Sequence, residues 1–168
     1  MRLEELHKLI PPCTIPDSQA GDWYIETRGV HKYLGYPRYD NVMNDTPEEI
    51  ALHETFVRAA YGRILITGLG LGLLPAALLR KPDVTRIEVV EIEQDVIALT
   101  RPYLQDERIV VHHGDAYMFE PQGQFDFAWH DLLYWDEPMS VAVRRLREHY
   151  RNHALAQFAW AEGEPWWH

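Results

Sequence analysis

The chain has 168 residues, of which 46% are hydrophobic and 25% charged, and its formal net charge is -10. This length suits a single compact unit that buries most of the surface its unfolded form exposes. The acidic balance disfavours general affinity for nucleic acid, and no window is apolar enough to span a membrane.

The first 62 residues are expected to form an N-terminal extension. The start, MRLEELHKLIPP, carries acidic residues where a signal peptide needs an apolar run, so export is not expected. With a single cysteine, Cys13, the chain suits the reducing cytoplasm. LEELHKLI predicts a short amphipathic helix before a proline-rich loop. DWYIETRGVHKYLGY alternates around Gly29 and predicts a small β-hairpin.

The segment NDTPEEIALHETFVRAA predicts one helix. Thr46 is the expected N-cap, Pro47 occupies the first helical position, and Glu49 completes a capping box. The expected buried stripe consists of residues one turn apart, namely Leu52, Phe56 and Ala60.

From residue 63 to 168 strands and helices alternate. Continuous apolar strands separated by helical segments predict a parallel sheet covered on both faces, that is, a three-layer α/β core. The predicted strands are RILIT, RIEVVE, RIVVHH, FDFAWHD and LAQFAW, and MSVAVRRLREHY is the predicted last helix.

The stretch ITGLGLGLL joins the first of these strands to a helix and carries Gly68, Gly70 and Gly72. In a doubly wound sheet this turn approaches the ligand closely, which favours residues without Cβ. The dinucleotide pattern G-x-G-x-x-G fails, because its third glycine would fall on Leu73 or Pro75. The observed G-x-G-x-G is the spacing seen in class I S-adenosylmethionine (SAM) methyltransferases.

Two carboxylates follow the next two strands. Glu91, with Ile92 beside it, ends the second strand next to the glycines, where it can accept hydrogen bonds from both ribose hydroxyls of a nucleoside. Asp115, with Ala116, follows the third strand and can meet the adenine amino group. Both acids could instead be solvent-exposed strand-end residues.

Residues 63–131 resemble the nucleotide-binding core of class I methyltransferases, and within them the aminopropyltransferase (spermidine synthase) branch. The resemblance rests on RILITGLGLGLL, VVEIEQDVIALTRPYL, DERIVVHHGDAYMF and FDFAWHDL. It implies a Rossmann-like fold and SAM as the cofactor. ALHETF is similar to a His-Glu segment of that branch, which implies that His53 borders the donor site as a substrate-binding residue.

Two departures separate the chain from that branch. Leu71 occupies the position of an aspartate in the glycine turn, and Tyr134 that of a second aspartate after the fourth strand. Both losses argue against a diamine held by charge. We therefore expect methyl transfer to a small-molecule acceptor. Aminopropyl transfer and a non-catalytic nucleotide-binding or interaction module remain the alternatives.

The segment WHDLLYW lies where the transferred group would be. Asp131 is expected to orient the acceptor or act as its base, and His130, Tyr134 and Trp135 are candidate substrate-binding residues. Neighbours on a strand face opposite sides, so only one of His130 and Asp131 should face the pocket. No metal site is expected, because the His112–His113 pair lacks a third ligand.

The predicted sheet is shorter than that of the family, which has seven strands where this chain has five. One wall of the acceptor site must then come from the N-terminal hairpin, the EPWWH tail or a second subunit. An uncharged fifth strand at the sheet edge invites pairing, so we expect a homodimer or small homo-oligomer.

Overall fold

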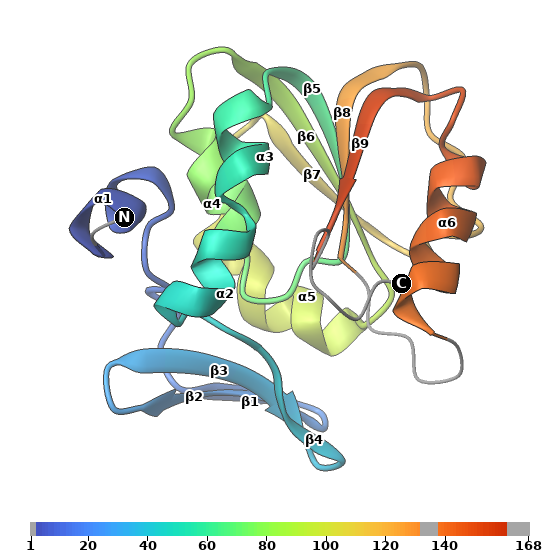
Figure 1. Cartoon of the computed structure of the whole chain (residues 1–168). Coiled ribbons are helices and arrows are strands. Elements are labelled where there is room, and N and C mark those ends of the chain that lie inside the picture. Colours follow the sequence, from blue (N-terminus) through green and yellow to red (C-terminus); the bar gives the residue numbers. More distant parts are fainter. Residues whose placement is uncertain (1–2, 132–137, 161–168) are drawn as a thin grey trace.

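A parallel sheet of five strands forms the centre of the molecule. The structure is a computed structural model that describes residues 3–131 and 138–160, and the sheet order is β7-β6-β5-β8-β9 (Figure 1). All five predicted strands are confirmed, and the carboxyl ends of β5, β6 and β8 meet at one edge. The strands are β5 (Gly62–Thr67), β6 (Val84–Glu91), β7 (Ile109–His113), β8 (Phe125–His130) and β9 (Ala154–Ala159).

Helices cover both faces of this sheet, as predicted. The helices that follow β5 are α4 (Leu73–Leu79), α5 (Gln94–Thr100), the 3-10 turn η1 (Arg101–Tyr103) and α6 (Met139–His149). Ile64 and Ile66 of β5 belong to the core beneath α4 and α5, whereas Leu65 belongs to a second core with Leu146 of α6. In the described part of the chain, no helix is long and apolar enough to cross a membrane.

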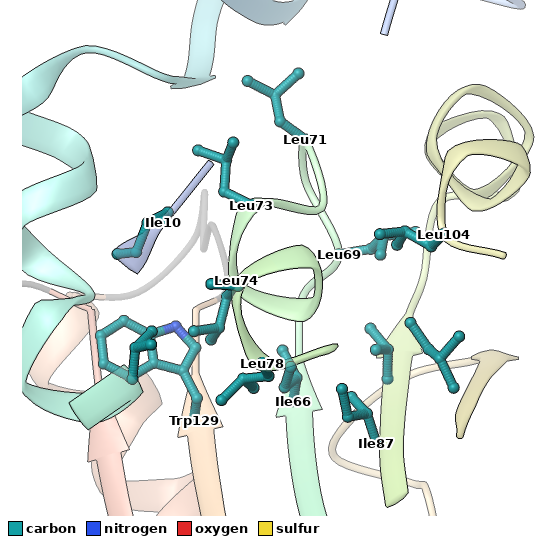
Figure 2. Packing of buried hydrophobic residues seen from close by; sticks show 14 of the residues in the cluster. Ile10, Ile66, Leu69, Leu71, Leu73, Leu74, Leu78, Ile87, Leu104 and Trp129 are labelled. Carbon is teal, nitrogen blue, oxygen red and sulfur yellow. The ribbon is translucent and has the colours of Figure 1, made fainter. Parts of the chain in front are cut away.

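The larger core lies between α4 and the sheet. Figure 2 shows Leu74 and Leu78 of α4 above Ile66 and Trp129 of the neighbouring strands β5 and β8. Burial of such side chains stabilises each by about 1.5–3 kcal/mol relative to exposure. This packing fixes α4, and with it the turn that connects β5 to α4.

The N-terminal extension contains more strands than the predicted hairpin. The helix α1 (Leu3–Leu9) precedes an antiparallel sheet of β1 (Ser18–Ala20), β2 (Trp23–Arg28), β3 (His31–Tyr36) and β4 (Tyr39–Asn44), hereafter the N-terminal sheet. The predicted hairpin is its β2–β3 pair. The prediction missed β1, which has three residues, and β4, whose polar sequence YDNVMN does not alternate clearly. The proposed boundary between residues 62 and 63 stays a prediction.

The predicted single helix is wrong, because the segment forms α2 (Pro47–Leu52) and α3 (Glu54–Ala59) on either side of His53. The Thr46 hydroxyl accepts the Glu49 amide at 3.5 Å, which confirms the N-cap. The capping box does not close, since the Thr46 amide donates to Asn44 Oδ1 at 3.0 Å. Leu52 is half-buried and the other two residues of the predicted stripe are buried.

β9 forms one edge of the parallel sheet and pairs with β8. Leu155 on this strand is 75% exposed. The predicted homo-oligomer depends in part on the C-terminal tail, residues 161–168. This tail lies outside the described residues, so the homo-oligomer stays a prediction.

Candidate functional site

The turn between β5 and α4 has a backbone conformation that favours glycine at three positions. Gly68, Gly70 and Gly72 all have positive φ, at 98°, 51° and 71°. A Cβ on Gly70 would clash with the sulfur of Met43, a residue of the N-terminal sheet. The left-handed φ strains any larger residue at these positions, and a side chain on Gly70 would also have to displace Met43. Gly72 is the N-cap of α4.

Glu91 connects this turn to the next helix. Its Oε2 accepts the Leu69 amide at 2.8 Å and its Oε1 accepts the Glu93 amide at 2.9 Å. The side chain is buried, and this burial raises the pKa of Glu91 while the two amides oppose the rise. Each carboxylate oxygen can accept a second hydrogen bond, so the group can serve a ligand while it holds the turn.

A cavity of about 120 Å³ lies at the carboxyl edge of the parallel sheet. Among the residues singled out in the sequence, Gly68, Gly70, Glu91, Ile92 and Asp131 line it. Ile92 is 54% exposed although it is apolar. The N-terminal sheet supplies a wall of this cavity through Trp23, Val42 and Met43; the sequence named the N-terminal hairpin as one candidate for a wall but did not single out these residues.

The residues after β7 lie outside this lining. Asp115 is exposed, and its Oδ1 accepts the Tyr117 amide at 2.8 Å. Ala116 is buried, and its carbonyl accepts the Tyr150 hydroxyl at 2.5 Å. Their predicted contact with adenine therefore stays a prediction. Tyr134 and Trp135 lie outside the described residues.

His130 and Asp131 separate as neighbours on a strand do. His130 is buried beside Tyr150 in the direction of α6, and its ring nitrogens lie 3.1 Å from Thr67 Oγ1 and 2.9 Å from Gln157 Oε1. Asp131 lines the cavity. The structure thus brings Asp131 into the candidate site and gives His130 partners within the protein core.

His53, the residue between α2 and α3, meets Asp131. Its Nδ1 lies 3.1 Å from the Glu49 carbonyl oxygen, which can only accept, so Nδ1 carries the proton. Its Nε2 lies 3.8 Å from Asp131 Oδ2. Within residues 3–131 and 138–160 this buried nitrogen has no hydrogen-bond partner. The His53 ring packs against Trp129 with centroids 5.1 Å apart.

Glu49 lies close to His53 and Asp131, although the sequence assigned it only to the helix cap. Its Oε1 accepts the indole N–H of Trp160 at 2.9 Å. Burial, and next the charge of Asp131, raise the pKa of Glu49. The sequence carried no signal for this pairing, because Glu49 and Trp160 are 111 residues apart. In the described ranges no group of three potential ligands could hold a metal ion.

Comparison with solved structures places the parallel-sheet core in the Rossmann-like fold of methyltransferases. The N-methyltransferase NodS from Bradyrhizobium japonicum WM9 superposes with a TM-score of 0.55 and 20% identity over 66% of this chain and 64% of NodS. NodS in complex with S-adenosyl-L-homocysteine gives the same TM-score and identity, with 58% of that chain covered. A DhpI–SAM–HEP complex matches with a TM-score of 0.50 and 17% identity over 64% of this chain and 51% of DhpI.

The chain thus spans less than two thirds of the length of these proteins. No family model and no curated protein matches it. These comparisons confirm the predicted fold, and they give no specific support to the spermidine synthase branch.

Proposed function

We propose that this chain binds SAM at the glycine turn and transfers its methyl group to a small-molecule acceptor. The observation that carries the proposal is the glycine turn held by Glu91 beside a cavity at the carboxyl edge of the sheet. In open α/β sheets ligands bind at this edge, near the point where strand order reverses. Here that point lies between β5 and β8.

The residues at this edge fit a nucleoside. The absence of a side chain at Gly70 lets a ligand approach the backbone, and the free acceptor capacity of Glu91 suits ribose hydroxyls. Ile92 offers an exposed apolar surface for a base beside Glu91. The structural neighbours NodS and DhpI are known in complex with S-adenosylhomocysteine (SAH) and SAM respectively, which supports the same donor here.

SAM supplies a methyl group on a positively charged sulfur. The residues of this chain then position the acceptor and receive its proton. Asp131, at the cavity wall, accepts the proton at Oδ2 as the nucleophilic atom of the acceptor loses it. His53 Nε2 lies 3.8 Å from this oxygen, which is beyond hydrogen-bond distance, so His53 takes no direct part in the transfer. Asp131 is the proposed base, and His53 packs behind it.

Calorimetry and thermal unfolding with SAM, SAH, decarboxylated SAM and NAD test the proposal. A ligand at one hundred times its dissociation constant should stabilise the fold by about 2.7 kcal/mol. We expect this with SAM and SAH but not with NAD. Tighter binding of decarboxylated SAM would favour aminopropyl transfer, and equal stabilisation by NAD would contradict the donor assignment.

Gly70→Ala tests the place of binding. Gly29→Ala is the matched control, because Gly29 also has positive φ, at 66°, but lies in the β2–β3 turn, where a Cβ would meet none of the described residues beyond its chain neighbours within 4 Å. Both variants carry the same kind of backbone strain. We expect Gly70→Ala alone to lose SAH binding. Unchanged affinity in Gly70→Ala would move the donor away from this turn.

A further inference from the structure

Met43, on β4 of the N-terminal sheet, lies against the glycine turn. Its Sδ accepts a hydrogen bond from the Leu71 amide at 3.2 Å, and it occupies the place that a Cβ on Gly70 would need. The space that the missing side chain of Gly70 leaves is therefore filled by Met43. A thioether is a weak acceptor, so this contact is easily exchanged for a better one.

Two strands of the N-terminal sheet contribute one wall of the cavity. This wall is formed by Trp23 of β2 and by Val42 and Met43 of β4. With these side chains in place the cavity holds about 120 Å³, whereas pockets for drug-sized ligands begin at roughly 300 Å³. A ligand as large as SAM must extend beyond this volume or displace part of the wall, and Met43 is the wall residue that contacts the turn.

The N-terminal sheet is itself anchored, because Ile25 and Leu34 are buried in the main core, so the part that can move is the side chain of Met43. At its junction with α2, buried Asp45 accepts the Cys13 amide at 3.0 Å and the Lys32 amide at 2.7 Å. On the other side β1 and β2 contact α5, and Gly21 lies directly against Asp95. Asp45 holds one end of β4, while Met43 is two residues away and meets the turn through its side chain.

We infer that the side chain of Met43, carried by the N-terminal sheet, is a gate over the donor site. The inference rests on the proposed function, since SAM is the ligand that the gate admits. Binding requires Met43 to leave the Leu71 amide and the space over Gly70. The resting chain is then closed to its own donor, and its apparent affinity is lowered by the fraction of molecules in which Met43 is in place.

Met43→Ala in the full chain tests the gate through SAH binding, measured by calorimetry together with association and dissociation rates. If Met43 must leave before SAH enters, the variant binds at least about fivefold more tightly, mainly through faster association. Met43→Leu keeps the bulk and should bind as the unmodified chain does. Val30→Ala truncates an exposed residue in the β2–β3 turn, outside the cavity lining, and should change the affinity less than about twofold.

Equal or weaker SAH binding by Met43→Ala, with faster dissociation, would make Met43 a wall of the bound ligand and overturn the gate. The proposed function would survive that result. If neither the unmodified chain nor Met43→Ala binds SAM or SAH, both proposals fail. Should Met43→Ala not fold, Met43→Val shortens the side chain with a residue that favours strands, and the same increase in affinity is expected.

Discussion

The two ends of the candidate cavity differ in how their buried polar groups are satisfied. At the end of β6, both oxygens of Glu91 accept backbone amides. At the end of β8, His53 Nε2 faces Asp131 at 3.8 Å without a hydrogen bond within the described residues. Glu49 is held there close to the charge of Asp131, with a raised pKa.

An unpaired buried polar group costs about 1–3 kcal/mol, whereas a paired one contributes to stability. At the Glu91 end the paired carboxylate holds the turn in one geometry. At the His53 end the polar groups that face each other contribute no such hydrogen bond within the described residues. Four substitutions or conditions test this difference.

Glu91→Ala is expected to have the largest effect. It leaves the Leu69 and Glu93 amides without their acceptor, at about 1–3 kcal/mol each, and we expect a loss of roughly 3 kcal/mol in the free energy of unfolding. Affinity for SAH should fall by about 1.5–3 kcal/mol. Chemical denaturation and calorimetry measure the two losses. Glu93→Ala is the control, because it removes an exposed neighbouring carboxylate and leaves the acceptor of both amides in place. It should change the free energy of unfolding by less than about 0.5 kcal/mol. Unchanged SAH affinity in Glu91→Ala would place the ribose contact elsewhere.

His130→Leu should cost about 2 kcal/mol of stability. Both ring nitrogens of His130 have partners, and the change leaves Thr67 and Gln157 without theirs. SAH affinity should stay the same in the folded variant, because the side chain does not line the cavity. A loss of affinity without a loss of stability would bring His130 back into the site.

His53→Leu is the matched substitution at the other buried histidine and should cost less than about 1 kcal/mol. It loses the hydrogen bond from Nδ1 to the Glu49 carbonyl, but it also removes the unpaired Nε2 and leaves an apolar side chain against Trp129, so the two effects largely cancel. A stability loss as large as that of His130→Leu would show that His53 is satisfied in solution, and the contrast between the two ends would disappear.

Mild acidification should produce the smallest effect. Burial raises the pKa of Glu49 and of Glu91, so in the window above the ordinary glutamate value of about 4.3 the folded chain binds protons that the unfolded chain has lost. The free energy of unfolding therefore falls as pH rises through that window. Glu49→Gln keeps an oxygen for Trp160 and should flatten the slope measured by denaturation at several pH values. An identical slope in the variant would mean that Glu49 titrates normally.

The sequence predicted the parallel sheet and the glycine turn because local signals determine both. Apolar strands alternate with helices from residue 63 onward, and the spacing of Gly68, Gly70 and Gly72 reflects a backbone that needs positive φ. The position of Glu91 followed from the end of its strand. These features depend on residues that are close in the chain, so the local sequence pattern is enough to predict them.

The contacts of His53 and the contact of Met43 with the glycine turn could not be predicted in the same way. His53 lies in a segment with a strong helical pattern, and the break there accompanies its packing against Trp129 and its approach to Asp131 at the end of β8. Met43 lies in a polar segment without strand alternation and reaches the turn across 28 residues of sequence. Such contacts depend on how two sheets dock.

The central position of β5 has a consequence for the order of folding. β5 pairs with β8, where Thr67 and His130 are 63 residues apart, whereas the β2–β3 hairpin joins Arg28 to His31. Closing a long loop delays contact formation, so local hairpins form early and the pairing of distant strands forms late. We expect the N-terminal sheet to form before the edge that it covers. In the newly made chain the N-terminal sheet would then be present before the carboxyl edge of the parallel sheet. The two would pack against each other only in the last steps of folding.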